Sequence, residues 1–420
     1  MIKNIKKILY IGSIPPELGG LVSGGVATYC WQLAKLAKNY GYEVQILGNS
    51  RSQIQRDGID IFPYVPTNNL FSKIISIAKG IRFYVTHYKV VRRKLSFLNL
   101  YQQLKVCYLA NILHYHYKRY HPDILHFHSL GSWMTLSSVL LDINVPIIIT
   151  HHGIAVAIKN LSQNTWPYET NRNLTIKMVK AVSNKADIII SPSKYAMQSL
   201  LETPLNLDPT KNQYVYLPIN TFHLDINMTQ ARKILKLPLD KPIILFVGAN
   251  HPFTIKGLDI LMNVFKNNST YQNDYYLVSV IDKINYQKIR KIFLPWIKLV
   301  SETSLKDLTL YYIASNALVV PSRHEAFCLV YLEALAHGLP IIGYKPSVEE
   351  LQSKLKIPIG FGFNPCEDNQ KILTEYINKL LLSSWNRNLI ADTTKLCFNE
   401  QEHFKLINSI YEQYAISRKY

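Results

Sequence analysis

Short apolar runs alternate with longer amphipathic stretches along most of this chain. The runs at 8–12, 146–150, 241–248 and 317–320 are rich in isoleucine, leucine and valine, which is typical of buried strands in a parallel sheet. The stretches between such runs have apolar residues three or four positions apart, as amphipathic helices do. Because strands that alternate with helices build parallel sheets covered by helices, we predict an α/β fold.

The alternation of strands and helices pauses near residue 218 and starts again at 241–248. A chain of 420 residues is too long for one ordinary core and long enough for two. We therefore predict a doubly wound domain at 1–218 and a second at 219–395, followed by a mostly helical segment at 396–420.

The stretch from Pro321 to Pro340 combines a strand end, a loop and a helix, in the sequence P-S-R-H-E-A-F-C-L-V-Y-L-E-A-L-A-H-G-L-P. The helical pattern runs from 327 to 337, and a glycine and a proline end it. A loop at the carboxyl end of a parallel strand is where open sheets bind ligands, and a helix N-terminus favours an anion. Glu325 and Glu333 suit hydroxyl groups there, although two glutamates eight residues apart are also common as solvated helix charges.

The composition agrees with a globular protein and adds one unusual feature, its charge. Hydrophobic residues make up 48% of the chain, and the five cysteines are scattered without a C-x-x-C pair. We expect a reducing, cytoplasmic compartment, no signal peptide before the first strand, and no membrane-spanning run. The 47 lysines and arginines exceed the 28 acidic residues and give a net charge of +19.

Much of this positive charge lies between 70 and 120, inside an interval from Asp60 to Asp123 that has no other acidic residue. Isoleucines and aromatic residues alternate there with lysines and arginines in a helical pattern. A basic amphipathic helix is typical of a protein that lies on an anionic membrane surface. A solvated basic face is an equal alternative. Nucleic acid fits less well, because no nucleic-acid-binding module accompanies the patch, and we predict none as a partner.

Two loops in the first half carry candidate binding residues. A glycine-rich loop at 19–25 follows the first strand, but it lacks the G-x-G-x-x-G spacing of a dinucleotide site. Histidines end the strands at 124–128 and 146–152, where a polar strand-end role is the simpler interpretation. They have no carboxylate or thiolate at metal-binding spacing and the chain has no D-x-D sequence, so we predict no metal site.

The stretch from Pro321 to Pro340 resembles the E-x7-E signature of glycosyltransferase family 4, whose members are retaining enzymes with the GT-B fold. The segments T-H-H-G at 150–153 and G-Y-E-V at 41–44 are similar to family motifs as well. The resemblance covers nearly the whole chain and is more specific in the second half. It implies two Rossmann-like domains facing across a cleft, with the acceptor on the first and the nucleotide sugar on the second. It also implies that the final helix crosses back to the first domain.

The resemblance implies site residues in both domains. Glu325 would bind hydroxyls of the donor sugar, Glu333 the ribose hydroxyls, and His152 the donor sugar. Lys256 fits as a cation for the diphosphate, because it precedes a helix in a loop. The remaining expected donor-binding positions are backbone groups at Gly24, Gly25, Gly248, Phe327, Cys328 and Leu329.

The chain departs from the family at two of these positions. Ala249 stands where the family has an arginine after the glycine, and Cys328 replaces a small glycine after E-x-F. His251 is a candidate to replace the missing cation. Ala249 keeps open a second class of function, a catalytically weak or inactive partner of another transferase that binds a sugar nucleotide or a membrane.

These observations predict a metal-independent retaining glycosyltransferase without a cofactor. It would move a hexosyl group from a nucleotide-diphosphate sugar to a lipid-linked or cell-surface polysaccharide acceptor, at the inner face of the membrane. Within enzymes, a sugar-nucleotide epimerase or a phosphorylase is the next candidate. A phosphorylase would need a pyridoxal-binding lysine motif, which the sequence does not contain.

Overall fold

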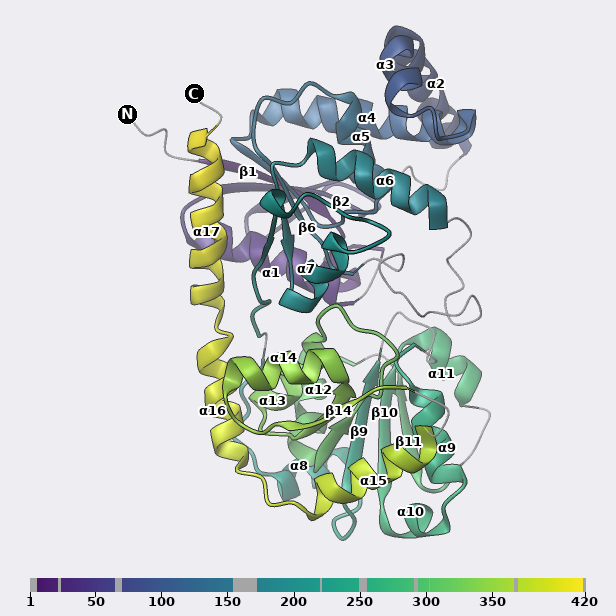
Figure 1. Cartoon of the computed structure of the whole chain (residues 1–420), viewed down its shortest axis with the longest axis vertical. Coiled ribbons are helices and arrows are strands. Elements are labelled where there is room, and N and C mark those ends of the chain that lie inside the picture. Colours follow the sequence, from purple (N-terminus) through teal and green to yellow (C-terminus); the bar gives the residue numbers. More distant parts are fainter. Residues whose placement is uncertain are drawn as a thin grey trace. The chain divides into compact units, whose positions relative to one another are not determined.

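The structure is a computed structural model, and it describes residues 6–21, 24–64, 70–153, 172–219, 221–248, 255–290, 294–301, 303–365 and 369–417. The chain divides into two compact units. The first unit comprises Met1–Asn160, Tyr168–Tyr216 and Gln401–Tyr420, and the second comprises Leu161–Pro167 and Leu217–Glu400. Each unit contains one mainly parallel sheet with helices packed against it (Figure 1).

The sheet of the first unit has eight strands in the order β3-β4-β2-β1-β5-β6-β7-β8. All neighbouring strands are parallel except β3, which pairs antiparallel with β4. The strands are β1 (Lys7–Gly12), β2 (Glu43–Gly48), β3 (Ile54–Arg56), β4 (Ile59–Pro63), β5 (Ile124–Phe127), β6 (Ile147–Thr150), β7 (Ile188–Ser191) and β8 (Asn212–Tyr214). The reversal of strand order falls between β1 and β5, which lie side by side.

Helices of the first unit cover the sheet and form its core. They are α1 (Gly25–Asn39), α2 (Leu70–Thr86), α3 (Tyr88–Lys94), α4 (Leu100–Tyr120), α5 (Trp133–Ser137), α6 (Arg172–Lys185), α7 (Lys194–Leu201) and α17 (Glu400–Ser417). One face of β1 contributes Leu9 and Ile11 to a buried apolar cluster that includes side chains of α4, α5 and α6. The alternate residue Tyr10 is hydrogen-bonded instead to Tyr411 of α17. The final helix therefore belongs to the packing of this sheet.

The sheet of the second unit has six parallel strands in the order β11-β10-β9-β12-β13-β14. The strands are β9 (Ile243–Gly248), β10 (Tyr276–Ile281), β11 (Ile297–Ser301), β12 (Ala317–Val319), β13 (Ile341–Tyr344) and β14 (Gly360–Phe363). Every residue of β9 and β12 is buried, as central strands with helices on both faces require. The strand order reverses between these two strands.

The helices of the second unit begin and end at residues that suit their positions. They are α8 (Met228–Leu235), α9 (Leu258–Lys266), α10 (Ser269–Asp274), α11 (Lys283–Ile289), α12 (Leu305–Ala314), α13 (Leu329–Ala336), α14 (Lys345–Leu355), α15 (Asn369–Leu382) and α16 (Arg387–Cys397). Ser304 caps α12 by accepting a hydrogen bond from the N–H of Asp307. Gly338, with φ of 72°, takes the left-handed conformation that ends α13.

The predicted α/β class with two doubly wound parallel sheets is confirmed. The helix expected at 327–337 is shorter, because Cys328 has an extended backbone with φ of −95° and ψ of 101° and α13 begins one residue later. Within the described residues, we find no helix with the length and apolar character needed to cross a bilayer.

Candidate active site

The candidate site of the second unit lies where the strand order reverses. β9 and β12 are neighbours there, and the chain leaves each of them through a loop at the carboxyl end of the sheet. In open α/β sheets this position forms the ligand-binding crevice, because the two loops diverge to opposite sides. Lys256 follows β9 and Glu325 follows β12, so two residues 69 positions apart in the chain meet at one point.

A close backbone contact holds the two loops together. The N–H of Arg323 donates a hydrogen bond to the carbonyl of Ile255, at 2.8 Å. Gly257 has φ of 78°, and a Cβ at this position would lie only 2.1 Å from the carbonyl oxygen of Pro321. Only glycine fits both the conformation and the space. The guanidinium of Arg323 adds two hydrogen bonds to the carboxylate of Asp259, at 2.9 and 2.7 Å.

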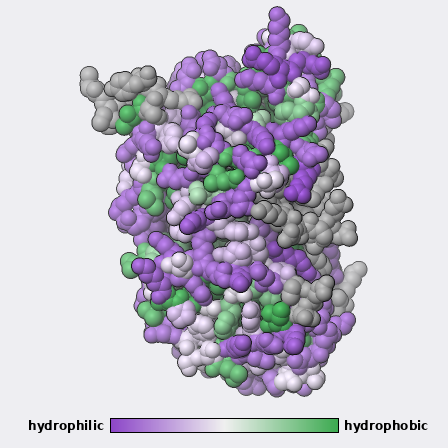
Figure 2. All heavy atoms as spheres, viewed as in Figure 1, coloured by the Kyte–Doolittle hydropathy of each residue, from purple (hydrophilic) through white to green (hydrophobic). Residues whose placement is uncertain are grey.

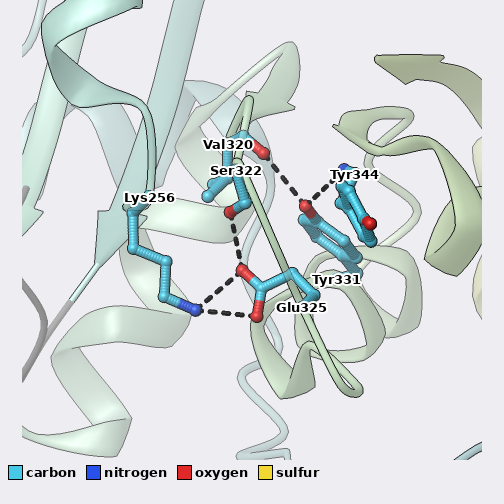
Figure 3. A network of polar contacts seen from close by, with 6 residues as sticks. All are labelled: Lys256, Val320, Ser322, Glu325, Tyr331 and Tyr344. Atoms are coloured by element: carbon cyan, nitrogen blue, oxygen red, sulfur yellow. Dashed lines mark hydrogen bonds and ion pairs between the residues drawn. The ribbon is translucent and has the colours of Figure 1, made fainter. Parts of the chain in front are cut away.

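Lys256 and Glu325 form a mostly buried ion pair at this junction (Figure 3). The Nζ of Lys256 donates to both carboxylate oxygens, at 2.7 and 2.9 Å. The hydroxyl of Ser322 donates to Oε1 of Glu325, at 2.6 Å. Nearby, the Tyr331 hydroxyl links Val320 to Tyr344 and joins the ends of β12 and β13. The carboxylate is thus held in one orientation by fixed donors.

The charges in this cluster depend on one another. Burial alone would lower the pKa of Lys256, but the Glu325 carboxylate raises it, and the lysine stays protonated. The pKa of His324 is lowered to about 4, mainly by burial; Glu325 opposes this shift and Lys256 adds to it. His324 is therefore neutral at pH 7, and the lysine supplies the positive charge beside Glu325.

Glu333 lies in the second turn of α13 and has a different environment. Its Oε2 accepts a hydrogen bond of 2.7 Å from the hydroxyl of Tyr312, a buried residue of α12. Burial raises the pKa of Glu333, this hydrogen bond opposes the shift in part, and the resulting pKa is about 7. Leu329 is the first residue of α13 and Cys328 is its N-cap, so Phe327 and Cys328 precede the helix rather than form its first turn.

The corresponding position in the first unit, at β1 and β5, carries neutral aromatic and imidazole groups. The rings of His126, His128 and His152 are stacked in sequence, with centroids 4.7 and 5.8 Å apart. The edge of the Tyr29 ring approaches His128 and His152, at 5.6 and 5.4 Å. Burial lowers the pKa of all three histidines, and other histidines of the first unit lower each pKa further. They are therefore uncharged at pH 7.

Two hydrogen-bonded chains connect this group of rings to α17. The ring of His126 bonds to Thr150 and to Tyr411, each at 2.7 Å, and Tyr411 also bonds to Tyr10. His403 bonds through Nδ1 to the carbonyl of Tyr216, which can only accept. The Nε2 of His403 must then be the acceptor for the Tyr29 hydroxyl, at 2.9 Å.

The structure brings some predicted site residues together and places others separately. Lys256 and Glu325 are in contact, whereas Glu333 pairs with Tyr312. His152 lies in the first unit with Gly24, which has φ of 119° and caps α1 before Gly25. Gly248 ends β9, and the departures at Ala249 and His251 lie outside the described residues.

Sequence reasoning did not assign roles to Ser322, Tyr312, Tyr29 or His128. Ser322 stands three residues before Glu325, close enough in the chain for the two side chains to meet in one loop. The other contacts arise from strand order and helix packing and have no local signal. Among the described residues, no group of three or more histidine, cysteine, aspartate or glutamate side chains is arranged to hold a metal ion. In the second unit, a buried cation beside an oriented carboxylate can bind an anionic, hydroxyl-rich ligand.

Two family models match the chain in succession. Residues 23–221 match Glycosyltransferase Family 4, and residues 227–395 match Glycosyl transferases group 1. These spans include His126, His128 and His152 of the first unit and the Lys256–Glu325 cluster of the second, whereas Tyr10, His403 and Tyr411 lie outside them. The chain belongs to the glycosyltransferases of this type. The family assignment places the Lys256–Glu325 cluster in the half that matches the group 1 model.

Relatives and solved structures agree with this family and fold. A D-inositol 3-phosphate glycosyltransferase of Mycolicibacterium paratuberculosis is 28% identical over 214 residues, which are 47% of this chain and 45% of that protein. The chain thus spans about half the length of this curated relative. Sucrose-phosphate synthase from Thermosynechococcus elongatus aligns over 97% of this chain and 99% of its own, with 19% identity and a TM-score of 0.72.

Two further solved structures have the same fold. WaaG, which is involved in lipopolysaccharide biosynthesis, aligns over 97% of this chain and 99% of its own, with 13% identity and a TM-score of 0.65. HepE of Anabaena, in complex with UDP-glucose, has the same coverage, 14% identity and a TM-score of 0.65. The GT-B fold expected from the resemblance is confirmed by these neighbours.

Proposed function

We propose that this glycosyltransferase moves a hexosyl group, with retention of configuration, from a nucleotide-diphosphate sugar to a lipid-linked or cell-surface polysaccharide acceptor. The observation that carries the proposal is the Lys256–Glu325–Ser322 cluster at the carboxyl ends of β9 and β12. A protonated lysine and an oriented carboxylate supply what a nucleotide sugar needs, a cation for the diphosphate and acceptors for hydroxyls.

The reaction assigned to this site is a direct substitution on one face of the sugar. The bond between the anomeric carbon and the diphosphate oxygen breaks, and its electron pair stays on that oxygen. The acceptor hydroxyl forms the new glycosidic bond from the same face and gives its proton to the leaving diphosphate. Lys256 stabilises the negative charge that develops, and no metal or cofactor takes part.

The remaining residues are assigned to binding. Glu325 accepts hydrogen bonds from hydroxyls of the donor sugar, and Glu333 from those of the ribose. The N–H groups of Phe327, Cys328 and Leu329 bind phosphate oxygens. Neutral His152 of the first unit, with the Gly24–Gly25 loop, is a hydrogen-bonding partner of the donor. The UDP-glucose complex of HepE and the lipopolysaccharide role of WaaG support a nucleotide-sugar donor and a glycan acceptor.

The test combines binding and turnover with a panel of nucleotide sugars. We expect one donor to be consumed by the wild-type protein, and Glu325→Gln to reduce turnover by about 10²-fold or more, since it removes an oriented charge from the reacting sugar. Lys345→Ala, which removes an exposed partner of Glu349 in the same unit, is the matched control and should keep full activity. Unchanged turnover in Glu325→Gln would refute the site.

Binding without turnover would favour the alternative, a sugar-nucleotide-binding partner of another transferase. A trapped glycosyl adduct on a side chain would instead refute the direct substitution. Loss of turnover in Glu325→Gln, binding without turnover, and a trapped adduct are different results, so one set of assays distinguishes the three hypotheses.

We also propose that the enzyme acts at an anionic membrane surface through α2 and α3. Ile77, Ile81 and Val85 project from one face of α2, and each is more than 40% exposed. The opposite face packs against α4, since a Cβ at Gly80 would lie 2.7 Å from the carbonyl oxygen of Leu104. Exposed lysines and arginines lie on the same two helices, at Lys79 and Arg82 of α2 and at Lys89, Arg92 and Arg93 of α3.

An apolar stripe flanked by cations is the arrangement that enters the headgroup region of a bilayer. On the face of the molecule shown in Figure 2, hydrophobic side chains are scattered among hydrophilic ones. We place the enzyme at the cytoplasmic face, where anionic lipids attract basic segments. The triple change Ile77→Ser, Ile81→Ser and Val85→Ser should abolish flotation with vesicles that contain phosphatidylglycerol. A matched pair of exposed leucines in the second unit, Leu382→Ser and Leu396→Ser, should leave flotation unchanged.

A further inference from the structure

The hydroxyl of Tyr312, in the second unit, has no role in the reaction proposed above. Tyr312 lies in α12, is 1% exposed, and donates its hydrogen bond to Oε2 of Glu333 in α13. These two helices are successive crossovers of the same sheet, so their packing fixes the distance between the two side chains. A buried phenol is thus aimed at the carboxylate assigned to the ribose.

The other groups around Glu333 do not replace this hydroxyl. The Nδ1–H of His337 donates to the backbone carbonyl of Glu333, at 2.7 Å, and its ring stacks on Tyr312. The thiol of Cys328 stays protonated because burial raises its pKa. Helix α16 presents Arg387 and Lys395, and their charges act on His337, where they help to lower its pKa.

No cation pairs with the Glu333 carboxylate within the described part of the chain. The negative charge of Glu333 is therefore stabilised by one neutral hydrogen-bond donor. A single neutral donor compensates only in part for the burial of a charge. The ionised and protonated forms of Glu333 are nearly equal in free energy at neutral pH, because burial raises its pKa to about 7 even with the Tyr312 hydrogen bond present. Removing the hydroxyl removes a bond made preferentially to the charged form, and the carboxyl group would then hold its proton at higher pH.

We propose that Tyr312 is a positioning residue that keeps Glu333 ionised and oriented, so that the enzyme selects ribonucleotide donors through their 2′- and 3′-hydroxyls. The proposal rests on the proposed function and adds a residue to its nucleotide site. An ionised carboxylate only accepts hydrogen bonds, and a ribose diol offers two donors. A protonated carboxyl group loses one of these acceptor positions, so recognition of the diol should weaken as Glu333 takes up a proton.

The experiment compares two ligands that differ only at the diol. Titration calorimetry with UDP, GDP and ADP identifies the preferred nucleoside diphosphate, which is then compared with its 2′,3′-dideoxy analogue from pH 5.5 to 9.5. Both ligands carry the same diphosphate, so the ratio of their affinities cancels phosphate titration. For the wild-type protein, we expect this ratio to be high at alkaline pH and to fall through a midpoint near neutrality.

In Tyr312→Phe we expect the midpoint to rise by about one pH unit or more, and the ratio at pH 7 to fall about fivefold or more, with recovery at high pH. Tyr311→Phe is the matched control. It removes the same hydroxyl from the neighbouring position of α12, where the pKa of Tyr311 is affected by burial and Asp307 rather than by Glu333. Its midpoint should equal that of the wild type. Glu333→Gln should give a ratio that does not change with pH.

Three results would overturn the inference. One is a wild-type ratio of the two ligand affinities that stays constant with pH. This result does not depend on the folding of any variant. Another is a Tyr312→Phe midpoint equal to that of Tyr311→Phe. The third is an equal loss of affinity for both ligands at every pH in Tyr312→Phe, which would mean that Tyr312 has a structural role only. A wild-type protein that binds none of the three nucleoside diphosphates would overturn the proposed function itself, and this inference with it.

Discussion

The two sheets present different chemistry at the same topological position. In the second unit, the loops after β9 and β12 carry a buried ion pair, Lys256 with Glu325. In the first unit, the described residues at the ends of β1 and β5 form no comparable pair, and the groups there are tyrosines and neutral histidines, among them His126 and His128. One fold thus provides a charged site in one half and an uncharged polar site in the other.

The difference follows from how each cluster satisfies its polar atoms. A buried charge persists only with a partner of opposite charge and further hydrogen bonds, as Glu325 has with Lys256 and Ser322. The clustered imidazoles of the first unit are buried and have no carboxylate partner among the residues that the structure describes, and they lose their protons instead. A charged site suits a diphosphate, and a neutral site suits hydroxyl groups. The following changes test this contrast.

The largest effect should come from Lys256→Ala, which leaves Glu325 buried without its cation. Breaking one partner of a buried pair costs roughly 3–5 kcal/mol, so we expect a loss of this size in the free energy of unfolding. Urea denaturation measures it. Lys345→Ala breaks an exposed pair with Glu349 and should cost less than about 1 kcal/mol. Equal losses in the two variants would mean that the Lys256 pair is no more important than a surface contact.

In the first unit, Tyr411→Phe should have the next largest effect. It removes the hydroxyl that joins Tyr10 to His126 and leaves two buried polar atoms without this partner, at a cost of roughly 1–3 kcal/mol. Tyr115→Phe, at an exposed position of α4, should change stability by less than about 0.5 kcal/mol. Should Tyr411→Phe be as stable as this control, the hydrogen-bonded chain would not stabilise the first unit.

The pH dependence of stability should also differ between the units. Burial holds the pKa of His126 at about 3 and that of His403 at about 4, against 6.5 for a free histidine. Below pH 6.5 the unfolded chain binds more protons than the folded chain. As the pH falls from 6.5 to the folded pKa, each of these histidines therefore lowers the free energy of unfolding by about 1.4 kcal/mol per pH unit. In the second unit His324 acts in the same direction.

Glu333 has the opposite sign. Its pKa rises from 4.5 to about 7, so the folded state binds more protons and stability is lost as pH increases between these values. Acidification from pH 7 to 5 should therefore destabilise the first unit more than the second. Hydrogen exchange followed by peptide mass spectrometry, corrected for intrinsic rates, should show faster opening of β5 and β6 than of β9 and β12. Equal acceleration in both sheets would contradict the contrast.

The smallest effect concerns the backbone that positions the charged pair. Gly257→Ala places a Cβ against Pro321 at a position with a left-handed backbone. Gly41→Ala is at a position that also has a positive φ, of 97°, but a Cβ added there would have no heavy atom within 4 Å. Both changes incur backbone strain of roughly 1 kcal/mol, and Gly257→Ala should cost roughly 1 kcal/mol more because the loop must shift. Thermal unfolding compares the two. Lower nucleotide affinity in Gly257→Ala alone would link the close contact to the site.

Much of this protein could be predicted from local sequence. Apolar runs such as 146–150 and 241–248 become buried strands, because a parallel sheet covered on both faces needs continuous hydrophobic residues. Gly338 and Pro340 end α13 through their own conformational limits. The positions of Lys256 and Glu325 in loops after strands were also readable, since strand ends and helix starts have local signals.

The contacts that define each site were decided only by the tertiary structure. The Lys256–Glu325 pair depends on β12 lying beside β9, and the Tyr312–Glu333 bond on the packing of α12 and α13. The contact between His126 and Tyr411 joins residues 285 positions apart. Propensity and periodicity act over a few residues, whereas strand order depends on long-range pairing of the whole chain. Sequence therefore determined which residues occupy the strand ends, and tertiary packing determined which of them are charged, neutral or in contact.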